Sequence, residues 1–320
     1  MAAKSTRAVV LAAGAVLLLG ACSSGGSGSS GGDAASTSSA TGFPSATPLP
    51  VRTPTPTPTP TPYGPVLTGW IAPLESAVGQ LAKAGSMDEF STALKDAGTK
   101  ADNASTGLSL ASEPAGVATA RRQLMVALGQ LAADLDKVRG DIRSKNLCAT
   151  SSALAKVGES EGLAGVAPAL KALADAGYPT SFNVPDMGKL QHRSLDNGTL
   201  VREGRLNGEG VLSIENGGSS DAVLSLAKGG KSVHSIFVSK GKTATLEGIE
   251  DGTYDIYFAG GADWDSSTKA FTQSCDFSKF DDTMEFETSR TYTKWSITLQ
   301  PTVGGNAQTS DVPEGTYPLP

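Results

Sequence analysis

The stretch of sequence that decides the fold is residues 243–258, TATLEGIEDGTYDIYF. In its second half, Tyr254, Ile256 and Phe258 alternate with other residues, so they share one face of an extended chain. Asp251-Gly252 separates the two apolar runs and is a strong turn signal. The stretch therefore predicts two short strands joined by a tight turn, with the alternating side chains in a core.

Runs with the same two-residue period continue on both sides, and turns rich in glycine, Gly260-Gly261 among them, separate most of these runs. Eight runs are predicted as strands: 211–215, 222–227, 232–238, 243–246, 253–258, 270–275, 283–287 and 292–299. Strands that recur about every 8–12 residues are typical of an antiparallel sandwich or barrel. We therefore predict a β-sandwich over residues 196–300, with Trp295, Ile297 and Leu299 as a second group of core residues. Residues 301–320 are predicted to be an irregular tail.

The period changes to the helical 3.6 residues in the preceding part of the chain, residues 66–178. Helices are predicted from about Val66 to Gly85, from Ser86 to Gly98, from Pro114 to Arg143 and from Thr150 to Gly177, the last one split by Pro168 and several glycines. One face of the first helix is apolar: Leu67, Ile71, Leu74, Val78 and Leu81. Ser86 and Glu89 resemble a capping box at the start of the second helix. Short loops between amphipathic helices favour an up-down helical bundle. Residues 179–195 show no clear period and are predicted to connect the two domains. The expected class is therefore α+β with two segregated domains.

The first 22 residues, MAAKSTRAVVLAAGAVLLLGAC, have the profile of a signal peptide. Lys4 and Arg7 precede an apolar stretch of 12 residues, Ala8 to Leu19, which is too short to span about 30 Å of hydrocarbon. Leu19-Gly20-Ala21-Cys22 resembles a bacterial lipobox. The resemblance implies cleavage after residue 21 and a diacylglycerol on Cys22, which would make membrane lipid a partner and place the protein on the extracytoplasmic face of the cell membrane.

Residues 22–65 are predicted to be a disordered tether between this anchor and the folded part. Ser, Gly, Ala and Thr dominate residues 23–50, and such a composition buries too little apolar surface to fold. Thr53-Pro54 then repeats five times through Pro62, which favours extended polyproline II. O-mannosylation of these threonines and a role as a proline-rich ligand are the alternatives for this segment.

Composition argues against most catalytic and nucleic-acid-binding classes. Two His and three Cys leave little material for a zinc site or for histidine acid–base chemistry. A net charge of −6 lacks the basic footprint of a nucleic-acid binder. The chain has no nucleophile elbow and no phosphate-binding loop. We therefore expect a protein that is not an enzyme and holds no cofactor.

Acidic residues gather in the predicted β-domain, where 11 basic and 18 acidic residues over 191–320 give a charge of −7. Many of them form an acidic cluster: Asp263, Asp265, Asp276, Asp281, Asp282 and Glu285. Asp263 and Asp265 are candidate metal ligands, because Asp263-x-Asp265-x-Ser267 resembles the start of a calcium loop. The loop lacks the expected Gly at its sixth position and Glu at its twelfth. Paired carboxylates also serve glycosidases, and turn carboxylates on a solvated loop are the third reading. Trp264 is a candidate for stacking on a sugar, or an anchor that packs onto the core.

Cys148 and Cys275 form an even pair once Cys22 carries lipid. Export to an oxidising compartment favours a disulfide between them, which would link the helical domain to the β-domain. Two buried free thiols are the alternative, because Cys is often buried without a partner.

The β-domain also carries family resemblances. Gly248–Tyr254, GIEDGTY, is similar to a turn and strand of transthyretin-like and Cna-B-like surface sandwiches. Residues 196–312 resemble a C-terminal module of uncharacterised secreted and lipid-anchored actinobacterial proteins. The runs that carry this second resemblance are LSIENG (212–217), GTY (252–254), DWD (263–265), FDD (280–282), WSITL (295–299) and GGNA (304–307).

The resemblance implies a Gram-positive cell envelope and transfers no activity. With the lipobox, it predicts a non-enzymatic cell-surface lipoprotein that binds or scaffolds an envelope protein or polysaccharide. The alternative is an envelope hydrolase, dependent on carbohydrate or metal, that uses the acidic cluster.

Overall fold

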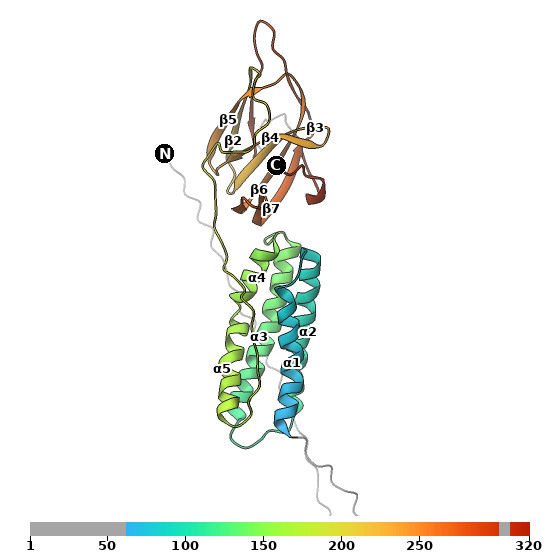
Figure 1. Ribbon diagram of the computed structural model, residues 1–320, viewed down its shortest axis with the longest axis vertical. Helices are drawn as coiled ribbons and strands as arrows, with labels where there is room; N and C mark the ends of the chain where they lie inside the picture. Colours follow the sequence, from blue (N-terminus) through green and yellow to red (C-terminus); the bar gives the residue numbers. More distant parts are fainter. Residues whose placement is uncertain (1–61, 301–307) are drawn as a thin grey trace, which may run out of the picture. The chain divides into compact units, whose positions relative to one another are not determined.

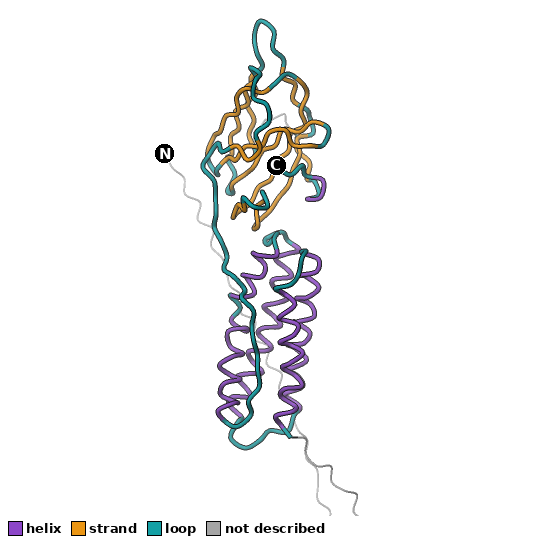
Figure 2. Tube along the Cα trace, viewed as in Figure 1, coloured by secondary structure: helices purple, strands orange, loops and turns teal. Residues whose placement is uncertain are grey.

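The computed structural model describes residues 62–300 and 308–320, which belong to one compact unit, Pro58–Pro320. The signal peptide, Cys22 and most of the Thr-Pro tether lie outside the described residues. The described chain is α+β, with helices first and then a mostly antiparallel β region (Figure 1, Figure 2). The predicted order of helical and β segments is therefore confirmed.

Five α-helices come first in the part of the chain that the structure describes. They are α1 (Tyr63–Leu81), α2 (Met87–Leu110), α3 (Ala118–Arg143), α4 (Thr150–Gly158) and α5 (Glu161–Asp175). Their apolar faces meet in one cluster, and the face predicted for the first helix is entirely buried: Leu67, Ile71, Leu74, Val78 and Leu81. The Ser86 hydroxyl caps α2 by accepting a hydrogen bond from the Glu89 N–H, as the sequence predicted.

Several predicted helix boundaries are wrong. Helix α1 begins at Tyr63, inside the segment predicted to be the tether, and ends at Leu81, before Gly85. Helix α2 continues past Gly98 to Leu110, because Ala101, Ala104 and Leu108 extend its buried face. Helix α3 begins at Ala118, so Pro114 lies outside it. The last helical segment is interrupted near Ser160, which caps α5 by accepting a hydrogen bond from the Leu163 N–H, while Pro168 lies inside α5.

The connector after α5 is more than a spacer, because it packs along the helices. Tyr178 meets Tyr63 edge-to-face with 5.2 Å between ring centroids. The Asn183 amide donates to Glu75 of α1 at 2.7 Å, and Met187 is buried in the helical core. Residues 179–195 show no periodicity because an extended segment with scattered anchors has none.

The β region contains two sheets. The first has the order β1-β4-β3-β6-β7-β10, with β8 also paired to β6, and the second has the order β5-β2-β9. All pairs are antiparallel except β2 with β9. The strands are β1 (Leu200–Arg202), β2 (Gly210–Asn216), β3 (Asp221–Lys228), β4 (Lys231–Val238), β5 (Lys242–Ile249), β6 (Gly252–Asp265), β7 (Ala270–Phe280), β8 (Met284–Phe286), β9 (Lys294–Thr298) and β10 (Thr309–Asp311).

Both sheets contribute to one apolar cluster. Leu212 of β2 and Ile297 of β9 join it from the smaller sheet, and Leu224 of β3 joins it from the larger one. The predicted core residues Tyr254, Ile256 and Phe258 are buried in the same cluster. A second cluster, on another part of the larger sheet, includes Tyr317 from the segment predicted to be an irregular tail.

Three features of the β region differ from the prediction. The segment predicted to be an irregular tail contains strand β10, which pairs with β7. Gly260-Gly261, predicted as a turn, lies inside β6, where the pairing register with β7 shifts. Trp295, predicted as a core residue, is 41% exposed, although Ile297 on the same face is buried. Both residues lie on the outermost strand of the smaller sheet, and of the two only Ile297 is packed into the apolar cluster that the sheets share.

The loop between α3 and α4 joins the helices to β7. The Cys148 N–H donates to the Thr272 carbonyl at 2.9 Å, and the Cys275 N–H donates to the Lys145 carbonyl at 2.9 Å. Cys148 and Cys275 themselves are joined by a disulfide with a Cα–Cα distance of 6.3 Å. The structure therefore contains the disulfide, and not the two buried free thiols that were the alternative.

Candidate functional site

The acidic pair at the end of β6 is engaged by an arginine from the connector. The Arg193 guanidinium donates to Asp263 through Nε at 2.8 Å and through Nη2 at 2.7 Å. The backbone N–H of Arg193 donates to the same carboxylate at 2.8 Å, and the Trp264 N–H returns a bond to the Arg193 carbonyl. The connector is thereby fixed to β6 through one buried carboxylate.

Asp263 has no acceptor capacity left for another ligand. Besides its three bonds from Arg193, it accepts one from the Thr272 hydroxyl at 2.6 Å. Two carboxylate oxygens provide about four lone-pair sites, and four donors fill them. The hydrogen bonds from Arg193 hold the pKa of the Asp263 carboxyl well below its usual range. Asp263 is therefore ionised and anchors the connector. A catalytic acid would instead have to keep its proton.

Asp265 is also engaged. It accepts hydrogen bonds from the backbone N–H and the hydroxyl of Ser267, and its second oxygen lies 3.3 Å from Arg193 Nη1. These bonds, the one from the Ser267 hydroxyl first, lower the pKa of Asp265. The structure thus brings both candidate metal ligands together, but it places the Arg193 cation between them. Within the described residues no group of three or more metal-ligating side chains comes together.

Trp264 is buried, with only 3% of its surface exposed. Its ring meets Phe271 edge-to-face at 5.1 Å between centroids and Phe237 at 6.1 Å. Burial of this kind leaves little of the ring open for stacking on a sugar. The core-anchor reading accounts for what the structure has.

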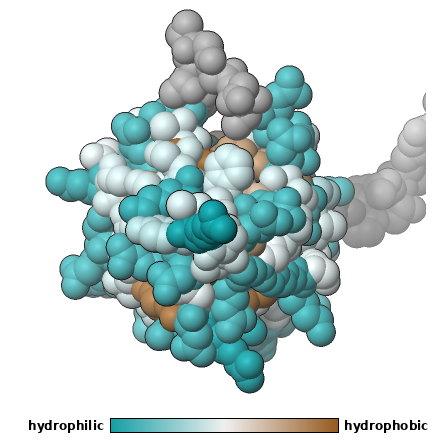
Figure 3. All heavy atoms as spheres, turned by 90° about the horizontal axis from the view of Figure 1, so that it is seen from above, coloured by the Kyte–Doolittle hydropathy of each residue, from teal (hydrophilic) through white to brown (hydrophobic). Residues whose placement is uncertain are grey.

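Exposed aromatic side chains occur elsewhere. Tyr292 is 44% exposed, Trp295 is 41% exposed and Trp70 of α1 is 37% exposed. The Trp295 indole N–H donates to the Glu285 carbonyl at 3.0 Å, which leaves the ring at the sheet edge. In the view of Figure 3 most of the visible surface is hydrophilic, and hydrophobic residues occur in small separate groups.

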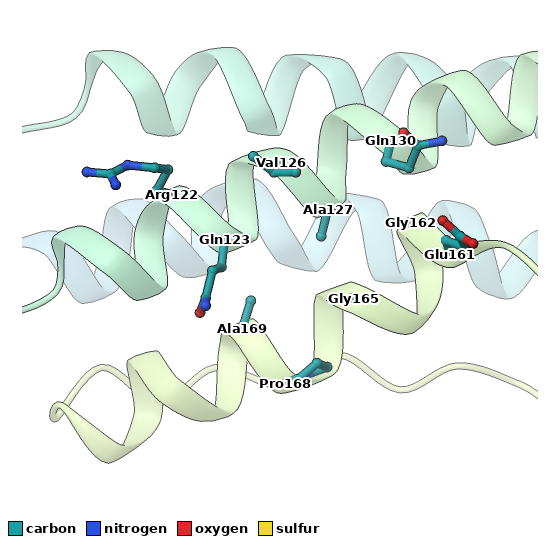
Figure 4. Close-up of a pocket in the computed structure, with 10 residues that line it drawn as sticks. All are labelled: Arg122, Gln123, Val126, Ala127, Gln130, Glu161, Gly162, Gly165, Pro168 and Ala169. Carbon is teal, nitrogen blue, oxygen red and sulfur yellow. The ribbon is translucent and has the colours of Figure 1, made fainter.

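An open groove with a volume of about 590 Å³ lies between α3 and α5. Arg122 and Gln123 lie toward one end of it, and Gln130 and Glu161 lie toward the other (Figure 4). Its remaining lining is apolar or small: Val126, Ala127, Gly162, Gly165, Pro168 and Ala169. Its volume falls within the range of sites that bind small molecules.

Small residues on α5 shape this groove. A Cβ on Gly162 would lie 2.2 Å from the Leu131 backbone nitrogen, so α3 and α5 approach closely only because this residue is glycine. Gly165 faces Ala127 less tightly, since a Cβ there would lie 3.1 Å from the Ala127 Cβ. Asp134 accepts hydrogen bonds from the Ser160 hydroxyl and the Gly162 N–H, which satisfies the first turn of α5. Because small residues line it, the floor of the groove is shallow and uncharged. Val126, beside the floor, is 67% exposed.

The sequence analysis did not identify this groove. The signal was present as Gly162, Gly165 and Ala169, small residues three and four positions apart that share one face of a helix. Such spacing predicts a close helix contact. It does not say that a groove opens beside the contact, because that depends on which residues of α3 face it.

The fold and the groove together define an α+β protein with an open surface depression, and no more specific class. No family model, no curated protein and no solved structure matches the chain. Among the described residues, no helix combines the length and the apolar character that crossing a bilayer requires.

Proposed function

We propose that this chain is a non-enzymatic binding or scaffolding module of a bacterial cell envelope, anchored by lipid on Cys22. The tether between Cys22 and the start of α1 at Tyr63 holds the folded part away from the membrane. We further propose that α1–α5 form a helical bundle and that the two sheets form a β-sandwich. The supporting observations are the single apolar cluster of the helices and the apolar cluster to which both sheets contribute.

The groove between α3 and α5 is the observation that carries this proposal. Its polar side chains, Arg122, Gln123, Gln130 and Glu161, include no nucleophile and no pair of carboxyl groups. Exposed Val126 offers apolar contact between a cation toward one end and a carboxylate toward the other. An arrangement of this kind suits binding, with the charged ends fixing the orientation of the bound molecule.

The alternative, an envelope hydrolase that uses the acidic cluster, has less support. A glycosidase of the common type needs one carboxyl that carries a proton and one that is ionised. Asp263 is saturated by four donors and its pKa is lowered, while Asp265 lies against the same arginine. Neither group is available to hold a proton for a leaving group.

The experiment measures capture of envelope material by the full chain. Val126→Arg places a bulky cation in the groove and is expected to reduce capture severalfold. Leu110→Arg is the matched control, because Leu110 is 83% exposed and lies outside the groove lining. Digesting the captured material with protease or with glycan hydrolases distinguishes a protein partner from a polysaccharide. Equal capture by wild type and Val126→Arg contradicts the proposal.

A further inference from the structure

Strand β9 (Lys294–Thr298) is the outer strand of the smaller sheet. The sheet order is β5-β2-β9, and β9 pairs in parallel with β2 along one edge. Among the described residues no strand pairs with its other edge. Open strand edges are sites where a further strand can add, and natural proteins usually protect them.

The register shows which backbone groups face the open edge. The Val211 N–H donates to the Thr293 carbonyl, and the Leu299 N–H donates to the Glu215 carbonyl. In a parallel pair the residues of one strand bond alternately toward and away from the neighbouring strand. Residues 293, 295, 297 and 299 therefore bond to β2. The N–H and C=O groups of Lys294, Ser296 and Thr298 point away from it.

The usual devices that protect an edge are weak here. Strand β9 contains no proline, and no register shift interrupts its pairing with β2. Lys294 Nζ lies 5.1 Å from the centre of the Tyr292 ring, so its charge is held over a residue that precedes β9. Trp295 is 41% exposed on the side of the strand that faces the core. An apolar side chain therefore flanks the free backbone groups.

We propose that β9 pairs with β9 of a second copy of this chain, antiparallel and about a twofold axis at Ser296. In this register Ser296 lies opposite Ser296 of the second copy, and Lys294 lies opposite Thr298. The residues that carry free backbone groups thus face one another as hydrogen-bonded pairs. The two smaller sheets then form one continuous sheet of six strands.

The sequence of β9 suits a copy of itself. Lys294 is the only charged residue of the strand, and the twofold register places a threonine opposite it, so no like charges meet. Trp295 lies opposite Ile297 of the second copy, and both side chains are on the core-facing side of the sheet. The pairing therefore covers the apolar surface of Trp295 that each copy leaves exposed. A strand of five residues makes a small interface, so the dimer is weak and depends on concentration.

Sedimentation equilibrium of the full chain carrying Cys22→Ser tests the pairing. Association is expected within about 1 μM to about 1 mM, the range typical of small interfaces. Ser296→Pro removes the central N–H from the free edge, where proline is tolerated, and is expected to weaken the dimer by about tenfold or more. Ser296→Ala keeps that N–H and is the matched control. Ser296→Ala should associate like wild type. The two variants should have the same melting temperature.

A cross-linking experiment in the same Cys22→Ser chain tests the register. Hydrogen-bonded residues in an antiparallel pair have Cα atoms about 5.5 Å apart, which a disulfide can span. Ser296→Cys is therefore expected to give a covalent dimer on mild oxidation. Lys294→Cys is not expected to cross-link, because the two copies of residue 294 lie about four residues apart along the paired strands.

Either of two results overturns the proposal. The first is a chain that remains monomeric up to about 1 mM, well above the Kd of a specific weak dimer. The second is cross-linking of Ser296→Cys no faster than Lys294→Cys. A monomeric chain that instead binds a foreign peptide along β9 would also contradict the second copy as the occupant of this edge.

Discussion

Replacing Asp263 by alanine should destabilise the protein strongly, because this carboxylate joins the connector to β6. Its side chain is only 2% exposed and accepts four hydrogen bonds, three of them from Arg193. Removing one partner of a buried ion pair typically costs about 3–5 kcal/mol. The Arg193 side chain is 42% exposed, so water can solvate its charge in the variant. We therefore expect a loss near the lower end, about 3 kcal/mol.

A loss of this size is easily measured. For a unit of this length, about 3 kcal/mol corresponds to a fall in Tm of roughly 6–12 °C. Urea unfolding of wild type and Asp263→Ala gives the free-energy difference directly. Asp281→Ala is the matched control, because the Asp281 side chain accepts its hydrogen bond from the Ser310 hydroxyl at an exposed position. The control should lie within about 0.5 kcal/mol of wild type.

The pH dependence of this difference tests its cause. The pKa of Asp263 is lowered in the folded protein, so its stabilisation is complete above the unfolded-state pKa and declines as the pH falls through the folded-state value. With an unfolded-state pKa of about 3.9, the advantage of wild type over Asp263→Ala should be about 1 kcal/mol smaller at pH 3 than at pH 7. An Asp263→Ala cost below about 1 kcal/mol, or a difference that does not change with pH, would refute this reasoning.

Three further predictions concern the cysteines and the two segments. Thiol titration of the unfolded, unreduced Cys22→Ser chain should find no free thiol, since Cys148 and Cys275 are bonded; two free thiols per chain would contradict the bond. Cys22→Ser should release the protein from the membrane fraction into the medium, and an unmodified Cys22 in membrane-bound protein, seen by intact mass, would contradict lipidation. The fragment 190–320 should unfold cooperatively, because its apolar clusters are formed almost entirely by its own residues; an aggregating or molten fragment would show that the helices complete its core.

The sequence predicted the helical and β segments well where side chains repeat with a regular period. Leu67, Ile71 and Leu74 are buried as their spacing predicted, and so are Tyr254 and Ile256. Periodicity reports which face of an element is apolar, and that face must be buried somewhere. It says nothing about strand order, so it could not predict that Trp295 lies on an outer strand.

The acidic pair shows a different limit. The sequence identified Asp263 and Asp265 as residues of chemical interest, but Arg193 is 70 positions from Asp263 along the chain and has no pattern of its own. The shift of pairing register in β6 and the positive φ of Asp263, 57°, lie where the carboxylate meets this arginine. Both features depend on tertiary contacts. A motif of carboxylates therefore predicted where an interaction occurs, but not that its partner would be a cation of the same chain.

The disulfide between Cys148 and Cys275 determines how this protein would carry a mechanical load. A pull between the chain before α1 and a molecule bound beyond residue 275 passes along α1–α3, across the two sulfur atoms and into the end of β7. The 126 residues enclosed by the bridge, with a contour length of about 430 Å, then bear no tension along their backbone. Under load α1–α3 can unravel, while α4, α5, the connector and β1–β6 lie within the covalent loop and cannot be drawn out until the bridge is reduced.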